Sequence, residues 1–295
     1  MDLFSDYLGP DWRTHQCSPE HWKRIDGLDE GALWSLKLAL KNGLFDAVFR
    51  RHEARSARLG RDLPAPALRS DRLTIGFARR FAAYKRGLLL FDDMARTKRL
   101  FTDSERPIQL LIAGKAHPAD EAGRAILRRL YEISQEPDLR DHVVVLEDHD
   151  MTLSRHMLEG CDLWLNAPRR PLEACGTSGM KAVFNCTLNC STLDGWWDEA
   201  YDGENGFAFG DRFVHTDVAV HVRRDAESLL DVLEQQVVPC YYERGPSGIP
   251  ERWLARAKHA LKTLAWRYNA NRMVIDYARL LYIAASRTGT ADVPG

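Results

Sequence analysis

The segment GTSGMK, residues 176–181, combines residue types that can hold an anion and place an amine beside it. Glycines flanking small polar residues are typical of a helix start, where free backbone N–H groups and the helix dipole favour negative charge. Lys181 would lie one turn inside that helix, between apolar neighbours. We therefore predict a buried lysine, whose lowered pKa would make it a good amine for a Schiff base.

Residues 176–181 also allow other interpretations. Most lysines are solvated surface residues. A nucleotide P-loop needs four residues between its first glycine and a Gly-Lys-Ser/Thr triplet, and residues 176–181 do not have that spacing. The three spaced glycines of a dinucleotide site are missing as well.

A second group of cations lies in ARRFAAYKR, residues 78–86. Guanidinium and ammonium groups match phosphate oxygens, so the segment predicts an anion site formed by Arg79, Arg80, Lys85 and Arg86. The alternative is a solvated basic helix start. Cations are disfavoured at that end of a helix unless an anion is present, which counts against the alternative.

Two further loops give weaker signals. AGKAHP, residues 113–118, offers Lys115 and His117, although a turn with two exposed polar residues explains it as well. EDHD, residues 147–150, could do acid–base work through His149, but helix capping by its aspartates explains the acidic residues equally well.

The four loops lie between short apolar runs and helical segments, which alternate along the chain and would hold the loops in place. We predict strands at 72–78, 108–114, 143–147, 162–166, 187–193 and 206–209. Helices are predicted at about 84–100, at 120–135, near 151–159 and from Thr177, with a mostly helical stretch from Asp225 to about Arg287. This alternation predicts an α/β fold whose doubly wound parallel sheet binds ligands at the carboxyl ends of its strands.

The predicted organisation is a helical lead-in segment, 1–60, followed after a proline-containing break by a Rossmann-like domain with C-terminal helices, 70–290. Lys and Arg total 41 against 42 Asp and Glu, so no overall field favours nucleic acid or an acidic membrane. We see no signal peptide and no apolar run long enough to span a membrane. The six cysteines are scattered, so we expect no metal site and a cytoplasmic location with reduced thiols.

Taken together, the motifs resemble those of the α-glucan phosphorylases, the family of glycogen, maltodextrin and starch phosphorylases. PLEACGTSGMKA, TLNCSTLDGWWDE and YDGENGFAFG are similar to its pyridoxal-phosphate region, and FARRFAAYKR to its phosphate-contacting strand end. The DGWWDE variant is most similar to the short bacterial and archaeal branch. The resemblance covers about residues 70–285 and implies the C-terminal half of a GT-B glycosyltransferase fold.

The resemblance implies roles for individual residues. Lys181 would carry pyridoxal 5′-phosphate, whose phosphate would be held by Arg79, Gly176 and Thr177, with His149 near the cofactor. Arg80 and Lys85 would bind inorganic phosphate and serve catalysis together with Lys181. Glu173, Ala174, Cys175 and Gly176 would contact the sugar.

The implied reaction converts α-1,4-glucan and phosphate to glucose 1-phosphate with retained configuration, the cofactor's phosphate exchanging a proton with inorganic phosphate. The family usually has Tyr at His149 and Gly at Cys186, where we expect added bulk in a packed helix. The resemblance also implies an N-terminal half with glucan-binding residues that this chain does not contain, so we expect negligible activity from the chain alone.

Three hypotheses remain open. The chain is a phosphorylase half that works with a separate N-terminal half, an inactive truncated paralogue, or a GT-B glycosyltransferase that uses a sugar nucleotide. The third has no need of Lys181 in its motif. Apolar surface meant for the other half would favour self-association into a homo-oligomer.

Overall fold

The centre of the molecule is one parallel sheet of six strands, seen in a computed structural model that describes residues 3–288. Residues 289–290, the end of the predicted 70–290 segment, lie outside the described residues, as do residues 1–2 of the lead-in. Every neighbouring pair of strands is parallel. The strands are β1 Leu73–Ala78, β2 Ile108–Ala113, β3 Val143–Leu146, β4 Leu163–Asn166, β5 Leu188–Thr192 and β6 Phe207–Phe209.

The order across the sheet is β3-β2-β1-β4-β5-β6, the doubly wound arrangement that the sequence predicts. All six residues of β1 and of β2 are buried, which explains why these runs are mostly apolar and do not alternate with exposed polar residues. Successive side chains of β2 enter the two different apolar cores, with Leu110 in one and Leu111 in the other.

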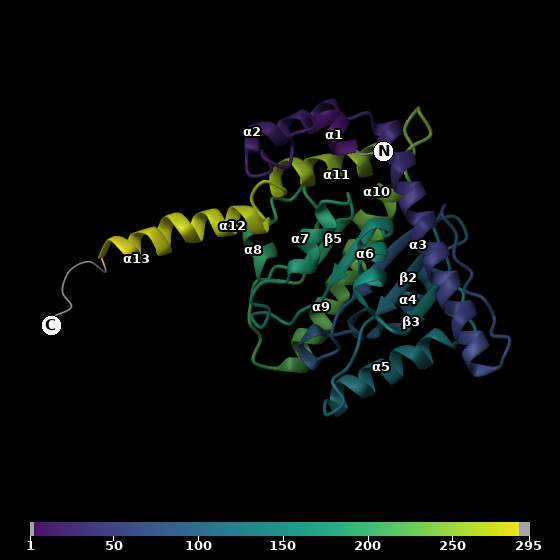
Figure 1. Cartoon of the computed structure of the whole chain (residues 1–295). Helices are drawn as coiled ribbons and strands as arrows, with labels where there is room; N and C mark the ends of the chain where they lie inside the picture. Colours follow the sequence, from purple (N-terminus) through teal and green to yellow (C-terminus); the bar gives the residue numbers. More distant parts are fainter. Residues whose placement is uncertain (1–2, 289–295) are drawn as a thin grey trace.

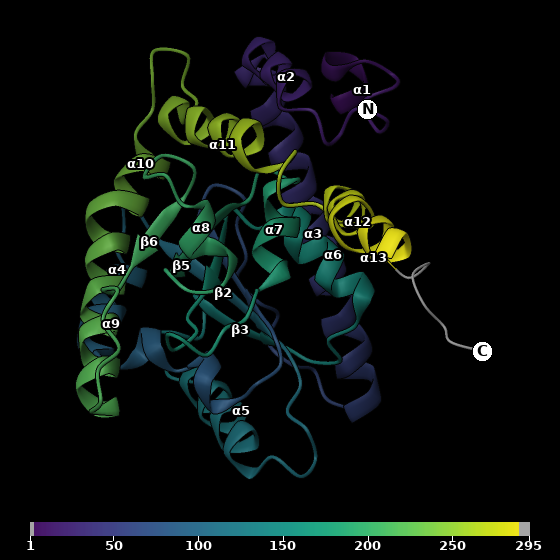
Figure 2. The same cartoon turned by 90° about the vertical axis from the view of Figure 1, so that its left-hand side faces the viewer.

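Helices cover both faces of the sheet (Figure 2). Figure 2 shows α3, α6 and α7 on one side and α4, α9 and α10 on the other. The helices that follow the strands are α4 Met94–Phe101, α5 Glu121–Ser134, α6 Met151–Gly160, α7 Thr177–Val183, α8 Trp196–Ala200 and α9 Val218–Val232. Aspartates cap α4, α5, α6 and α9, which satisfies N–H groups of each first turn.

Two predicted helix boundaries are wrong. In place of one helix over 84–100, the chain forms the 3₁₀ turns η2 Ala83–Lys85 and η3 Leu89–Phe91 before α4. Arg86 between them has a left-handed backbone, with φ 49°, which ends any continuous helix. Helix α9 begins at Val218 rather than Asp225 because Asp217 caps it.

The N-terminal segment is helical as predicted and packs onto the sheet domain. It forms α1 Leu3–Leu8, α2 Pro19–Trp22, the 3₁₀ helix η1 Lys23–Gly27 and the 30-residue α3 Glu30–Leu59. Helix α3 packs along α6, and its side chains Leu44 and Val48 share a core with Leu111 of β2 and Trp164 of β4. Gly60 ends α3 in a left-handed conformation, with φ 59°.

The C-terminal segment is helical too. A π-helical turn, η4 Leu233–Val237, leads into α10 Val238–Tyr242, and α11 Glu251–Leu264 follows. The chain then forms α12 Ala270–Tyr277, η5 Ala278–Tyr282 and α13 Ile283–Thr288. These last three elements, which we call the C-terminal arm, extend away from the body of the molecule (Figure 1).

Candidate anion and amine site at the switch point

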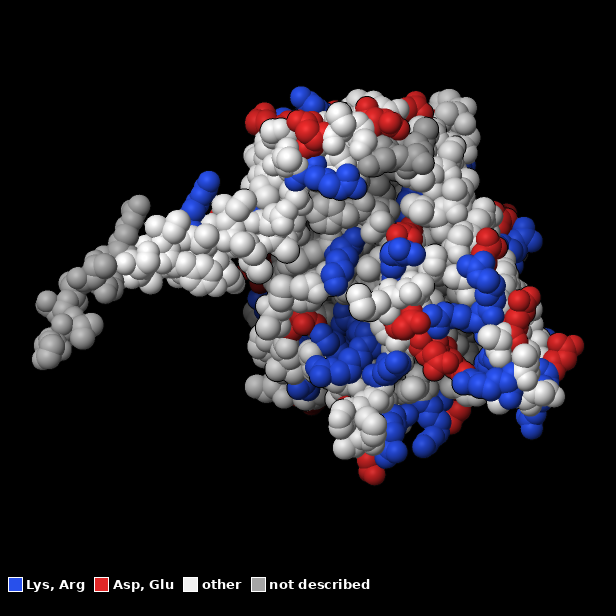
Figure 3. Space-filling model, in the orientation of Figure 1, with Lys and Arg blue, Asp and Glu red and all other residues white. Residues whose placement is uncertain are grey.

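The strand order places the topological switch point of the sheet between β1 and β4, and we call the carboxyl edge at this point the crevice. The chain leaves β1 toward β2 on one side of the sheet and leaves β4 toward β5 on the other, so the loops after these two strands separate at the carboxyl edge. These loops are residues 79–86, within the basic segment 78–86, and residues 167–176, which lead into the segment 176–181. Lys and Arg side chains gather on this face of the molecule between α7 and α5 (Figure 3).

Arg79 is a largely buried cation at the end of β1. Its Nη2 donates a hydrogen bond to Asn166 Oδ1 at the end of β4, whereas its Nε and Nη1 are buried and have no partner among the described residues. Burial lowers the pKa of the guanidinium to about 10. A buried donor without an acceptor costs free energy, so this side chain is suited to an anion.

Two asparagines, on the neighbouring strands β4 and β5, extend the hydrogen bonding that starts at Arg79. Asn166 Nδ2 donates to Asn189 Oδ1 at 2.8 Å, and Asn189 Nδ2 is a further buried donor without a partner in the described chain. Sequence reasoning missed both asparagines. The available signal was an amide side chain within each of the predicted strands DLWLN and TLNCSTL.

Helix α7 begins at this crevice, as predicted. Gly176 adopts φ 89°, which a residue with a side chain rarely does, and it offers no side-chain cap to the first-turn N–H groups. A Cβ on Gly179 would lie 2.6 Å from Asn189 Oδ1, so the glycine lets α7 approach β5. Thr177 and Ser178 lie in the same first turn, and Ser178 Oγ donates to Asn166 Oδ1 at 3.4 Å.

Lys181 is exposed, so the predicted burial of its side chain is wrong. Gly179, Ala182 and Val183 form the buried face of α7. Because successive helical residues are rotated by about 100°, Lys181 lies on the side opposite to that face. Its apolar neighbours in sequence are therefore not its neighbours in space.

Arg80 and Lys85 differ in their surroundings. Arg80 is exposed, while Lys85 forms an ion pair with Glu173 in which the two side chains are 13% and 12% exposed. Lys85 Nζ also lies 4.6 Å from the centre of the Tyr84 ring. The structure thus brings together one residue predicted to bind phosphate and one predicted to bind sugar.

The loop from Glu173 to Gly176 rests on the segment that follows β5. Asp194 Oδ2 accepts a hydrogen bond from the Glu173 N–H at 2.9 Å, and the Trp196 N–H donates to Cys175 O at 3.0 Å. Burial raises the pKa of Asp194. Ala174 and Cys175 are exposed at the crevice.

The loop after β2 packs against the basic loop. A Cβ on Gly114 would lie 2.0 Å from Arg79 O, so only glycine fits there. The Phe81 N–H donates to Lys115 O at 3.0 Å, and the Lys115 side chain is exposed.

His149 lies in the loop after β3. Its Nε2 lies 2.7 Å from Ser154 Oγ, and burial together with the charge of Lys115 lowers the pKa of His149.

Arg86 is not part of the open site. Its guanidinium is buried and donates to Ala167 O, to Pro168 O and to Asp225 Oδ2 at 2.6 Å, which ties the basic loop to the β4 loop and to α9. Burial lowers its pKa. The prediction that Arg86 binds an anion is therefore wrong, because its donors are already used.

Cys186 has a left-handed backbone, with φ 53°, three residues beyond the end of α7. The expected effect of this departure, added bulk within a helix, is therefore wrong. A glycine would adopt this conformation without strain. The free-energy cost of a cysteine at position 186 is therefore that of its left-handed backbone conformation.

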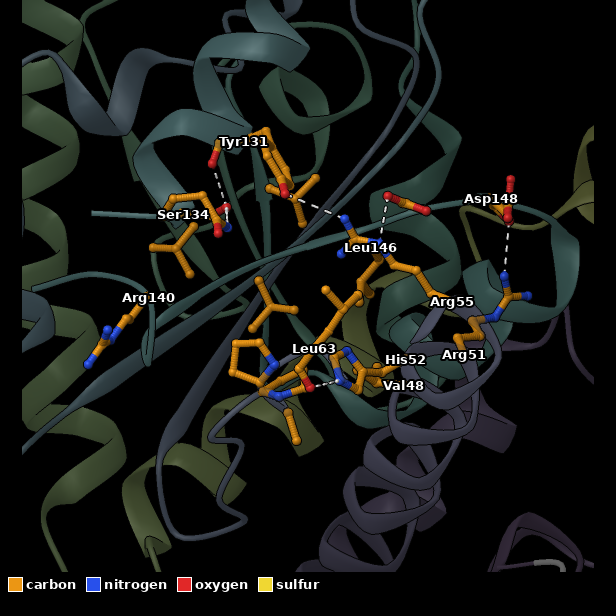
Figure 4. A pocket seen from close by; sticks show the side chains of 18 of the residues that line it. Val48, Arg51, His52, Arg55, Leu63, Tyr131, Ser134, Arg140, Leu146 and Asp148 are labelled. Atoms are coloured by element: carbon orange, nitrogen blue, oxygen red, sulfur yellow. Dashed lines mark hydrogen bonds and ion pairs between the residues drawn. The ribbon is translucent and has the colours of Figure 1, made fainter. Parts of the chain in front are cut away.

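A separate cavity of about 740 Å³ lies between α3, α5 and the edge strand β3 (Figure 4). Of the residues described, none of those predicted for the site lines it. Three of its arginines, Arg51, Arg55 and Arg58, already pair with acidic side chains, and the fourth, Arg140, is exposed to solvent. These cations thus differ from Arg79, which has buried nitrogens without a partner.

Within residues 3–288, no helix is long and apolar enough to cross a membrane. The same range contains no group of three or more His, Cys, Asp or Glu side chains placed to hold a metal ion.

The fold and the site define a doubly wound α/β protein with a largely buried, partly unpartnered arginine at its switch point, next to a helix that carries an exposed amine. The family model for carbohydrate phosphorylases matches residues 68–236, more than half of the chain. The chain belongs to the carbohydrate phosphorylase family.

Curated relatives agree. The chain is 41% identical to a maltodextrin phosphorylase of Thermococcus litoralis over 96% of this chain and 34% of that protein. It is 41% identical to a glycogen phosphorylase of Aquifex aeolicus over 95% of this chain and 41% of that protein. It is 42% identical to a glycogen phosphorylase of Mycobacterium tuberculosis over 92% of this chain and 32% of that protein. The chain therefore spans between about a third and two fifths of the length of these relatives.

Proposed function

We propose that this chain is the cofactor- and phosphate-binding half of an α-1,4-glucan phosphorylase that forms glucose 1-phosphate. The observation that carries the proposal is Arg79, whose buried guanidinium has two nitrogens without a partner beside the start of α7. Family membership and the names of the relatives support the reaction.

The residues at the crevice fit pyridoxal phosphate. Its phosphate would be held by the unpartnered nitrogens of Arg79 and by the first turn of α7 at Gly176 and Thr177. Lys181, one turn along the same helix, would supply the amine that holds the aldehyde, with His149 near the cofactor. When bound, the cofactor supplies a phosphate that exchanges a proton with the substrate phosphate.

The remaining residues would handle the substrates. Arg80 and Lys85 bind inorganic phosphate, because two cations are needed to hold two phosphate groups close together. Glu173 and the backbone of Ala174 and Cys175 contact hydroxyl groups of the sugar. Lys85 is paired with Glu173, so substrate binding would replace this ion pair with separate contacts to phosphate and to sugar.

A second polypeptide region must complete the site. Lys181, Arg80 and Cys175 are exposed, and an open crevice neither excludes water nor orients a glucan. We propose that a glucan-binding half, corresponding to the part of the relatives that this chain does not match, covers the carboxyl edge. The C-terminal arm offers an apolar contact for it, since Val274, Leu280 and Tyr282 are 57%, 72% and 65% exposed.

The test is to incubate the chain with pyridoxal phosphate, reduce it with borohydride and map the modified peptide. We expect the label on Lys181, its loss in Lys181→Arg, and no change in Lys23→Arg, an exposed lysine paired with Glu20. Label spread over exposed lysines would contradict the cofactor assignment.

Activity is tested separately. The chain is mixed with glycogen and phosphate, with and without the N-terminal half of a glycogen phosphorylase, and glucose 1-phosphate is assayed. We expect product only with both halves. Label on Lys181 without turnover would favour the inactive paralogue, and glucan extension from a sugar nucleotide would favour the other class of glycosyltransferase.

A further inference from the structure

Two lysines one turn apart on α3 are buried in the body of the molecule. Lys37 is 5% exposed and Lys41 is 1% exposed. Lys41 forms an ion pair with Asp162 at 2.6 Å, which is the usual condition for burying a charge. Lys37 instead donates to uncharged oxygens: Glu159 O at 2.7 Å, Asn185 O at 2.9 Å, Cys161 O at 3.1 Å and Thr187 Oγ1 at 3.1 Å.

The acceptors of Lys37 lie where two helices end. Glu159 and Cys161 are at the C-terminus of α6, and Asn185 follows the C-terminus of α7. The last carbonyls of a helix lack partners within the helix and carry the negative end of its dipole. One ammonium group therefore bonds to carbonyls at the end of α6 and in the turn that follows α7, and it joins both to α3.

Helix α7 is short, so its two ends are coupled. It has seven residues, which corresponds to about 10 Å. Its C-terminal end is held by Lys37 through Asn185. Ser178 in its first turn shares the acceptor Asn166 Oδ1 with Arg79, and its exposed face carries Lys181. A displacement at the held end would move the amine and the first turn together.

We propose that Lys37 is a positioning residue for the cofactor: by holding the C-terminal end of α7 it sets Lys181 and Gly176 relative to Arg79. This inference rests on the proposed function. Lys37 lies outside residues 68–236, the segment matched by the family model, so the helix that precedes that segment contributes to the geometry of the site.

The experiment compares Lys37→Met with the double variant Lys41→Met and Asp162→Asn. The control removes the second buried ammonium of α3 and its partner charge. The other acceptors of Lys41, namely Ser70 O, Arg72 O and the Tyr241 hydroxyl, lie away from α7. Hydrogen exchange is measured in peptides covering 176–187 and 70–78, and the pyridoxal phosphate concentration for half-maximal borohydride-fixed label on Lys181 is determined.

For Lys37→Met we expect faster exchange in 176–187 and a half-saturating concentration raised about tenfold, the equivalent of about 1.4 kcal/mol. The control should exchange faster in 70–78 and label within about twofold of the natural chain. If Lys37→Met does not fold, Lys37→Gln, whose amide still donates two hydrogen bonds, is compared with the same control.

Equal labelling of the Lys37 variant and the natural chain would overturn the proposal, as would an equal loss in the control. If the natural chain takes no label on Lys181, the proposed function fails. In that case, faster exchange in 176–187 for the Lys37 variant alone still supports its hold on α7, and unchanged exchange there refutes it.

Discussion

Lys85 and Glu173 form an ion pair across the crevice between the loops that follow β1 and β4. Under the proposed function each side chain contacts a substrate, so we expect the ion pair to compete with substrate binding in the free chain. Replacing Glu173 by Gln should release the ammonium of Lys85 and raise the affinity for inorganic phosphate by about three- to tenfold. Isothermal titration calorimetry measures this change.

The control for that variant is Glu147→Gln, which changes the net charge equally but acts at the remote cavity, where Glu147 pairs with Arg55 and Arg58. Its phosphate affinity should equal that of the natural chain. Weaker phosphate binding by Glu173→Gln would show that Glu173 orients Lys85 rather than blocking it.

Two buried arginines on one loop should respond oppositely to replacement by Met. Arg79→Met removes unpartnered buried donors, so the free energy of unfolding should stay unchanged or rise while pyridoxal phosphate binding weakens at least about tenfold. Arg86→Met leaves Asp225 without its guanidinium and should cost about 3–5 kcal/mol. Denaturant unfolding and dye-detected melting with and without the cofactor measure both effects. A large loss of stability in Arg79→Met would argue against a ligand role.

His149 should make the protein less stable in mild acid. Burial lowers its pKa below the usual 6.5, so the unfolded chain takes up this proton at a higher pH than the folded chain does. The neutral ring thus makes its full contribution to the free energy of unfolding above pH 6.5. This contribution is lost as the pH falls through 6.5 toward the pKa of the folded chain. Lys115 and Arg51 favour the neutral ring, and Asp150 opposes them.

The measurement is the unfolding free energy of the natural chain and of His149→Gln between about pH 8 and pH 5. His21 and His221, whose pKa values burial also lowers, remain in both proteins, so only the difference between the two curves reports on His149. Below pH 6.5 the unfolding free energy of the natural chain should fall relative to that of His149→Gln. Parallel curves would show that the ring does not titrate there.

The C-terminal arm should drive association. Replacing Leu280 and Leu281, which are 72% and 55% exposed, by Ser should change the unfolding free energy by less than about 0.5 kcal/mol. The same change should lower self-association and weaken capture of a supplied N-terminal half, as measured by light scattering after gel filtration. Replacement of exposed Met151 on α6 by Ser is the control and should alter neither property. A monomeric natural chain that pairs normally after both arm substitutions would contradict the expectation.

The sheet was predictable because its strands are short, mostly apolar runs that end at polar loops. The interruption of the predicted helix at Arg86 could not be predicted from the sequence. The Arg86 side chain contacts Ala167 and Asp225, which are far away in sequence, while its backbone is left-handed. The exposure of Lys181 could have been predicted from helical rotation rather than from adjacent residues. The Asn166–Asn189 contact depends on the pairing of β4 with β5, which a linear pattern does not specify.

The buried lysines of α3 also limit the order in which the chain can reach its native state. Helix α3 precedes its partners along the chain, because the acceptors of Lys37 lie 122 to 150 residues further along. Contacts of such long sequence separation slow folding, because a large loop must close before they form. The Lys37 ammonium therefore cannot reach all four acceptors before the segment up to Thr187 has been synthesised, so the turn that follows the amine-bearing helix gains this contact only after that loop has closed.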